Sequence, residues 1–135
     1  MDQGPLVSDE IDAGDDLVRD FDNFQPVKVA FWLKASDDQI RYLYIASDRI
    51  DDTNFRVAYG EVLRLAADLR KSGRGYLNPF RVKVVGAANP LAKAALELIQ
   101  QYPPGSPAEL DETTFGGISV DDAYVYPSLH PLTSP

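Results

Sequence analysis

Basic and aromatic side chains gather in one stretch of this sequence, and that combination is typical of polyanion binding. Residues 64 to 83 contain six of the twelve basic residues that follow residue 22: Arg64, Arg70, Lys71, Arg74, Arg81 and Lys83. Tyr76 and Phe80 are interleaved with them. Because basic side chains contact phosphates and aromatic rings stack on nucleobases, the stretch predicts a site for nucleic acid or another polyanion. The alternative interpretation is that these charges complement a helix C-terminus and coat a solvent-facing strand.

The turn Gly-Ala-Ala-Asn-Pro at residues 86–90 is a second candidate, for a small anionic ligand. It follows a predicted strand and opens a predicted helix, where free N–H groups hold phosphate or carboxylate. Gly86 and Asn89 are the residues that would form this anion site. The turn lacks the Gly-x-Gly-x-x-Gly pattern and the P-loop lysine. Ordinary capping by Asn89, with Pro90 at the first helical position, explains the same residues.

Three aromatic residues of a predicted hairpin form a third candidate, a protein-contact surface. Tyr42 and Tyr44 share one face of the return strand, and we expect Trp32 on the more polar face of the first strand, opposite a tyrosine. Exposed aromatic patches and free strand edges are common places of association. The hairpin therefore predicts contact with a protein partner or with a second copy of the chain, as a homodimer.

Residues that perform acid–base, nucleophilic or metal chemistry are scarce. The sequence has no cysteine and a single histidine, His130, which lies two positions after Ser128 in a proline-rich tail. A hydrolase triad or a zinc site needs more than this. Asp48, Asp51 and Asp52 form a carboxylate cluster, but helix capping explains it better than a metal loop does. We therefore expect no metal site and no cofactor, and we favour a non-enzymatic role.

The negative charge is concentrated at the N-terminus. The whole chain carries −8, and residues 1–22 carry eight acids and one base, a net charge of −7. Residues 23–135 carry 13 acids and 12 bases, a net charge of −1, which opposes strong nucleic-acid binding. With few large apolar residues, the N-terminal segment is predicted to be a disordered acidic leader. Leu17, Phe21 and Phe24 recur at helical spacing, so docking of this segment in a groove or onto the basic stretch is the alternative.

Hydrophobic periodicity and capping residues predict the elements that position these candidates. The elements in order are two strands paired as an antiparallel hairpin (27–34 and 40–46), a helix (54–72), a strand (80–85), a helix that starts at Pro90 and ends before Pro103, and two short strands (113–120 and 123–126). Phe80 is expected to face inward with Val82 and Val84. Gly60 costs its helix about 1 kcal/mol relative to alanine, which predicts a close neighbour there.

These elements predict an α+β fold with a mixed or antiparallel sheet of three to five strands, in the order β-β-α-β-α-β, covered on one face by two helices. The predicted organisation is a flexible leader (1–24), one domain (25–127) and a C-terminal tail (128–135). The sequence shows neither a signal peptide nor an apolar run of about 20 residues, so we expect a cytoplasmic protein without membrane contact. The leading hypothesis is an interaction or accessory protein. A polyanion binder and a small-anion-binding domain are the alternatives.

Overall fold

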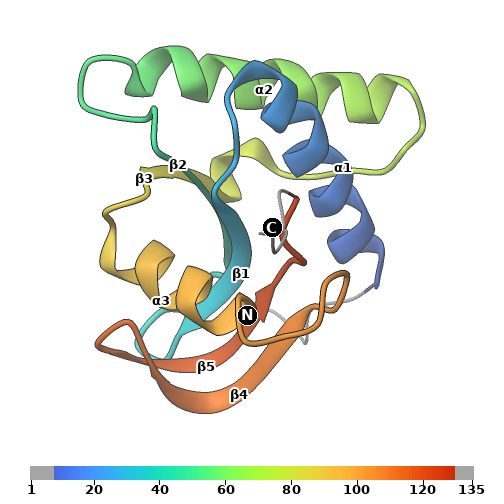
Figure 1. Cartoon of the computed structure of the whole chain (residues 1–135). Helices are drawn as coiled ribbons and strands as arrows, with labels where there is room; N and C mark the ends of the chain where they lie inside the picture. Colours follow the sequence, from blue (N-terminus) through green and yellow to red (C-terminus); the bar gives the residue numbers. More distant parts are fainter. Residues whose placement is uncertain (1–7, 130–135) are drawn as a thin grey trace.

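The computed structural model describes residues 8–129, so expectations about residues 1–7 and His130 lie outside the described residues. The helices are α1 (Ser8–Phe24), α2 (Phe55–Lys71) and α3 (Pro90–Ile99), with a short 3-10 helix, η1 (Pro79–Arg81). The strands are β1 (Val29–Ala35), β2 (Tyr42–Ser47), β3 (Val82–Gly86), β4 (Ala108–Phe115) and β5 (Ile118–Val125). The predicted α+β class with a mixed sheet is confirmed (Figure 1). None of the described helices combines the length and the apolar character that a membrane span requires.

The sheet has five strands in the order β3-β2-β1-β5-β4. Strands β1 and β2 are antiparallel, with Trp32 opposite Leu43, which confirms the predicted hairpin. Strands β2 and β3 are parallel because α2 carries the chain back along the sheet between them. The pairs β1–β5 and β5–β4 are antiparallel. Strands β3 and β4 therefore form the two edges of the sheet.

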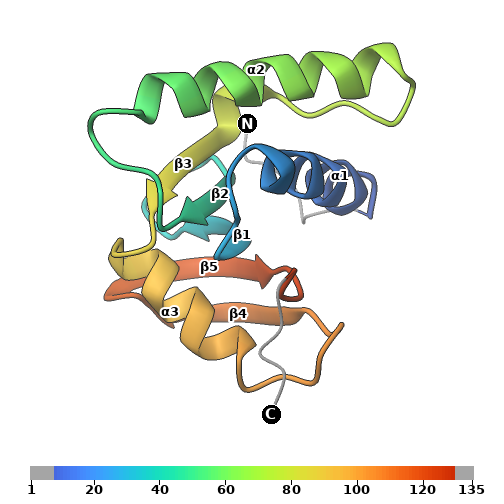
Figure 2. The same cartoon turned by 45° about the horizontal axis from the view of Figure 1, so that its top comes forward.

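Helices cover both faces of the sheet, whereas we expected them on one face. Helices α1 and α2 lie on one side and α3 lies on the other (Figure 2). Successive side chains of β1 explain this arrangement, because Ala30 and Trp32 join the core under α1 and α2, while Val29 and Phe31 join the core under α3. A strand that is apolar on both faces must be covered on both faces.

Helix α1 occupies the segment predicted to be a disordered leader, and for residues 8–24 that prediction is wrong. Leu17 and Phe21 are fully buried, in the core that also contains Trp32. The Tyr126 hydroxyl donates a hydrogen bond to the Ile11 carbonyl (2.7 Å) and accepts one from Trp32 Nε1 (2.8 Å). The few apolar residues of this segment are enough to order it as a helix because the sheet offers them a matching apolar surface. The composition of the segment alone does not reveal that surface.

A two-residue glycine turn joins β4 and β5 inside the range where we expected a single strand (113–120). Gly116 and Gly117 have φ angles of 59° and 88°. Two consecutive positive φ angles are the signature of a type I′ hairpin turn, which glycine adopts readily. The Gly-Gly pair was the sequence signal for this hairpin. The element order therefore differs from the predicted one at both ends, with α1 added at the start and a complete hairpin at the end.

Candidate functional site

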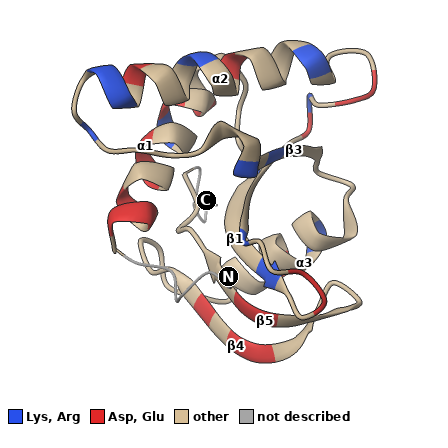
Figure 3. Cartoon of the chain, turned by 180° about the vertical axis from the view of Figure 1, so that it is seen from behind, with Lys and Arg blue, Asp and Glu red and all other residues tan. Residues whose placement is uncertain are grey.

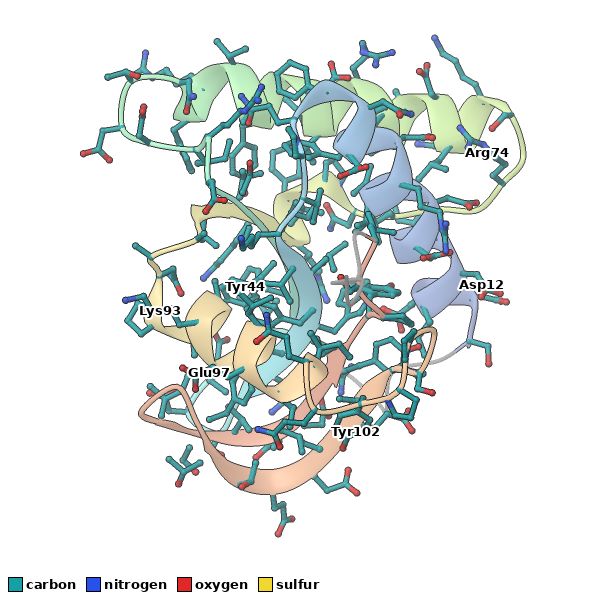
Figure 4. The ribbon with its side chains drawn as sticks, in the orientation of Figure 1. Asp12, Tyr44, Arg74, Lys93, Glu97 and Tyr102 are labelled. Carbon is teal, nitrogen blue, oxygen red and sulfur yellow. The ribbon has the colours of Figure 1, made fainter. Side chains whose placement is uncertain are left out.

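The three hairpin aromatic residues do not form one exposed surface. Trp32 is 2% exposed and lies under α1 and α2, so its expected place on a polar face is wrong. Tyr44 is 8% exposed and lies on the opposite face of the sheet, inside the fold (Figure 4). Its ring stacks on Phe31 with centroids 4.9 Å apart. The structure brings Tyr42 and Tyr44 together beneath Lys83, whose Nζ lies 4.1 Å and 5.6 Å from the two ring centroids, but it separates both from Trp32.

The predicted anion-binding turn is occupied by its own cap. Asn89 Oδ1 accepts hydrogen bonds from the backbone N–H groups of Leu91 (2.9 Å) and Ala92 (3.3 Å), and Pro90 has no N–H group to offer. A Cβ added at Gly86, the last residue of β3, would lie 3.1 Å from the Ile50 carbonyl. The glycine therefore allows the end of β3 to pack closely against the loop that contains Ile50. The predicted cap is confirmed, and it leaves the first turn of α3 without a donor for an anion.

The six basic residues predicted to bind a polyanion are divided among different surroundings. Arg64 pairs with Glu61 (2.5 Å) and Asp68 (3.0 Å) on its own helix. Arg74 pairs with Asp20 of α1 (3.2 Å), so the acidic helix does reach the basic stretch. Lys83 lies on the α3 side of the sheet with the tyrosines. Arg70, Lys71 and Arg81 have no carboxylate partner at ion-pair distance among residues 8–129.

Large apolar side chains are exposed beside these unpaired bases. Among them are Leu63 (45%), Tyr76 (63%) and Phe80 (77%). Tyr76 lies against Arg70, whose guanidinium carbon is 5.8 Å from the ring centroid. Arg56, Leu63 and Arg70 fall at i, i+7 and i+14, which places them on one stripe of α2 that faces away from the core.

The segment with Phe80 lies beside this stripe. Helix η1 packs against α2, and the Tyr59 hydroxyl of α2 donates a hydrogen bond to the carbonyl of Val82, directly after η1 (Figure 1). We define the α2 outer surface as the stripe of α2 that contains Leu63, together with side chains of the segment that follows α2. Its exposed members are Arg56, Leu63, Arg70, Tyr76 and Phe80, and the half-buried Arg81 completes it.

Two of our expectations about this region are wrong. Phe80 does not face inward with Val82, because Asn78 accepts a hydrogen bond from the Phe80 N–H (3.0 Å) and starts η1 at Pro79, so the strand begins two residues later. The Asn-Pro pair was the signal for this helix start. Gly60 has no atom within 4 Å of the position where a Cβ would lie, so no neighbour in the described chain requires a glycine there.

A cavity of about 600 Å³ lies elsewhere, between the start of β1, the end of β2 and the loop that follows α3. Val27, Ile99 and Tyr102 give it apolar walls, and an ion pair between Lys28 and Asp48 (3.6 Å) lies at its rim. Sequence reasoning did not identify this hollow, because its walls come from segments that are far apart in the chain. The lining thus combines apolar packing with the charged side chains of Lys28, Asp48 and Arg49.

The surroundings of several ionisable side chains move their pKa values further from pH 7. Burial raises the pKa values of Tyr44, Tyr59 and Tyr126. The hydrogen bond from Thr53 lowers the pKa of Asp51, and the hydrogen bond from Lys34 lowers the pKa of Asp121. None of these shifts produces an acid or base poised near pH 7. The described part of the chain also contains no group of three histidine, cysteine or acidic side chains that could hold a metal ion.

Comparison with known proteins adds no identification to this geometry. No protein-family model matches the sequence, and no curated protein or solved structure matches it at a significant level. We therefore infer function from the surface chemistry of the fold. The α2 outer surface is the most distinctive part of that surface.

Proposed function

We propose that this chain is a non-enzymatic protein-interaction module that binds a protein partner through the α2 outer surface. The observation that carries the proposal is the exposure of Leu63, Tyr76 and Phe80, at 45%, 63% and 77%, beside arginines without carboxylate partners in the described chain. Clustered exposed apolar side chains mark interaction sites, and aromatic residues with arginine are enriched in protein interfaces.

The proposed partner is a protein, as the sequence predicts. The proposed contact surface is the α2 outer surface and not the aromatic residues of the hairpin. Trp32 and Tyr44 are buried on opposite faces of the sheet, so they stabilise the fold and cannot meet a partner together. Binding through the α2 outer surface does not require any core residue to become exposed. The cytoplasmic location stays a prediction, which fluorescence microscopy of the tagged full chain would check.

Nucleic acid is the second candidate partner, because Tyr76 and Phe80 are exposed next to Arg70 and Arg81. Two features favour a protein instead. Leu63 is an exposed aliphatic side chain that can neither stack on nucleobases nor contact phosphate. Glu61, Asp68 and Asp20 already pair with Arg64 and Arg74, so these two arginines are not available to a row of phosphates.

The test uses a double variant, Leu63→Ser with Phe80→Ser, and a matched control, Ile118→Ser. Ile118 is a comparably exposed apolar residue (38%) at the start of β5. A partner captured by the full chain from its source cells would be purified, and its affinity measured directly by calorimetry. We expect the double variant to weaken binding by about tenfold or more, equivalent to roughly 1.4 kcal/mol, and the control to bind as the wild type does. Equal binding by the double variant would contradict the proposal.

A further inference from the structure

Charge is separated between the two edges of the sheet. Residues 55–83, which contain α2, η1 and the start of edge strand β3, carry seven bases and two acids, a net charge of +5. The hairpin of β4 and β5, residues 108–125, carries five acids and no base, a net charge of −5. Figure 3 shows the basic residues along α2 and the acidic residues on β4 and β5. The α2 outer surface therefore belongs to a basic stretch of a chain whose total charge is −8.

The arginines of the α2 outer surface are the ones left without internal partners. Arg64 and Arg74 are paired with carboxylates at 2.5 to 3.2 Å, whereas Arg56, Arg70 and Arg81 have no such partner among the described residues. Arg56 and Arg70 lie on either side of Leu63 on one stripe. At 1.5 Å per residue they are about 21 Å apart along the helix, the length of four turns.

The secondary structure of a partner on this surface follows from the hydrogen bonding of α2. Residues 55–71 form a helix, whose backbone groups bond within the helix and leave no strand edge to extend. A partner that covers α2 therefore binds it through side chains over about 20 Å, as a helix packed alongside α2 does.

The chain already contains one contact of this kind. Helix α1, which is acidic and amphipathic, lies against the other side of α2 (Figure 2), and its Asp20 pairs at 3.2 Å with Arg74 in the loop that follows α2. Its apolar residues Leu17 and Phe21 are buried between α2 and the sheet. Helix α2 and the loop that follows it thus accept an acidic helix on one side through an arginine and apolar contacts, and α2 presents the same two kinds of side chain on its outer side.

We infer that the partner that binds the α2 outer surface is an acidic amphipathic helix of another protein, with carboxylates that meet Arg56 and Arg70 and apolar side chains that cover Leu63 and Phe80. This inference rests on the proposed function and names the chemistry of its partner. A symmetric pair of copies joined through this surface would bring the same arginines together, which like-charge repulsion disfavours. A head-to-tail contact with the acidic hairpin of another copy would build a ring or an open chain of copies, which sedimentation of the chain alone would reveal.

The test selects binding peptides from a random 18-residue display library on the immobilised full chain. We expect the selected peptides to be enriched in aspartate and glutamate, with apolar residues every three or four positions, and to bind less tightly as salt increases. The charge-reversal variant Arg56→Glu with Arg70→Glu should weaken them at least tenfold. The control Lys93→Glu, which changes an exposed lysine of α3 (Figure 4), should leave them unchanged. Peptides with lysine in place of their acids should regain binding to the charge-reversal variant.

The outcomes separate this inference from the proposed function. Peptides that lose binding with Leu63→Ser and Phe80→Ser but carry no excess of acids would overturn the inference and leave the proposed function standing. No peptide sensitive to those substitutions would overturn both. Binding of a fluorescent 20-nucleotide oligouridine, lost in the charge-reversal variant, would overturn the inference in favour of nucleic acid. Concentration-dependent assembly of the chain alone, seen in sedimentation and lost in the same variant, would overturn it in favour of self-association.

Discussion

Helices α1 and α2 cover the same face of the sheet and each has 17 residues and one internal glycine, yet the two glycines have opposite surroundings. A Cβ added at Gly14 of α1 would overlap the Tyr126 hydroxyl and lie 3.1 Å from Trp32 Nε1. A Cβ added at Gly60 of α2 would meet no atom within 4 Å. Packing within this chain explains why α1 has its glycine, and it does not explain the glycine or the exposed apolar residues of α2.

This difference shows where function should be sought. In α1 the large apolar residues Leu17, Val18 and Phe21 are buried, Phe24 at its C-terminal end is 37% exposed, and the side that faces solvent is acidic. In α2 the inner side is buried in the same way, but Leu63 and the arginines of its outer side contribute little to the core. Residues that the fold does not require are the ones available for a partner.

The largest expected effect is that of Gly14→Ala. The added methyl group must displace the Tyr126 hydroxyl from its hydrogen bonds, so we expect the free energy of unfolding to fall by about 3 kcal/mol. Urea denaturation followed by circular dichroism would measure this change. An unchanged or raised midpoint would show that α1 is not held closely against Tyr126, and the comparison of the two helices would fail.

Tyr126→Phe should have the next largest effect, because it removes the hydroxyl group that joins α1 to the sheet. The Trp32 N–H group would lose the oxygen that accepts its hydrogen bond, and the Ile11 carbonyl would lose a donor. We expect a loss of about 2 kcal/mol in the free energy of unfolding. Tyr102→Phe, on a half-exposed side chain, is the control and should change stability by less than about 0.5 kcal/mol. Similar effects from both variants would contradict the assigned role of the Tyr126 hydroxyl.

The buried Tyr126 hydroxyl also predicts that the stability of the protein decreases in alkaline solution. Burial raises the pKa of Tyr126 above that of a free tyrosine, so above about pH 10 the unfolded chain loses a proton that the folded chain keeps. The stabilising effect of the protonated hydroxyl is fully present below pH 10 and is lost as the pH rises, by up to about 1.4 kcal/mol per pH unit. Urea midpoints between pH 8 and pH 11 should fall in the wild type and fall less steeply in Tyr126→Phe. Equal slopes would exclude Tyr126 as the source.

Gly60→Ala should have the smallest effect and the opposite sign. Alanine has a higher helix propensity and meets open space there, so we expect the free energy of unfolding to rise by about 1 kcal/mol. The thermal midpoint of the full chain would measure it, with Gly14→Ala as the contrasting variant. A decrease would show that a neighbour does approach Gly60, as we predicted from the sequence.

Local sequence signals accounted for most of the individual elements. The alternating apolar residues around Phe31 predicted the β1–β2 hairpin, and Asn89 with Pro90 predicted the start of α3. The helix predicted over 54–72 is α2, flanked by Asn54 and by Gly73 with its φ of 73°. Two further local signals were present but overlooked: the Asn-Pro pair before Phe80 and the Gly-Gly pair between β4 and β5.

The candidate site was predicted less completely. Six basic residues between 64 and 83 were singled out, and Arg70 and Arg81 do belong to the α2 outer surface. Arg64 and Arg74 belong to ion pairs with α2 and α1, and Lys83 lies on the other face of the sheet. No sequence pattern distinguishes a paired arginine from an unpaired one, since the pairing depends on which helix lies next to it.

The sequence by itself thus determined the β1–β2 hairpin, the extent of α2 and the start of α3, because caps, turns and periodicity act between residues a few positions apart. Only the tertiary structure decided that α1 is ordered, that Trp32 is buried and that Phe80 is exposed. Each of these depends on contacts between distant segments, such as Tyr126 with Ile11 and Trp32. The separation of +5 and −5 at opposite edges of the sheet likewise follows from the strand order, which places β3 and β4 farthest apart.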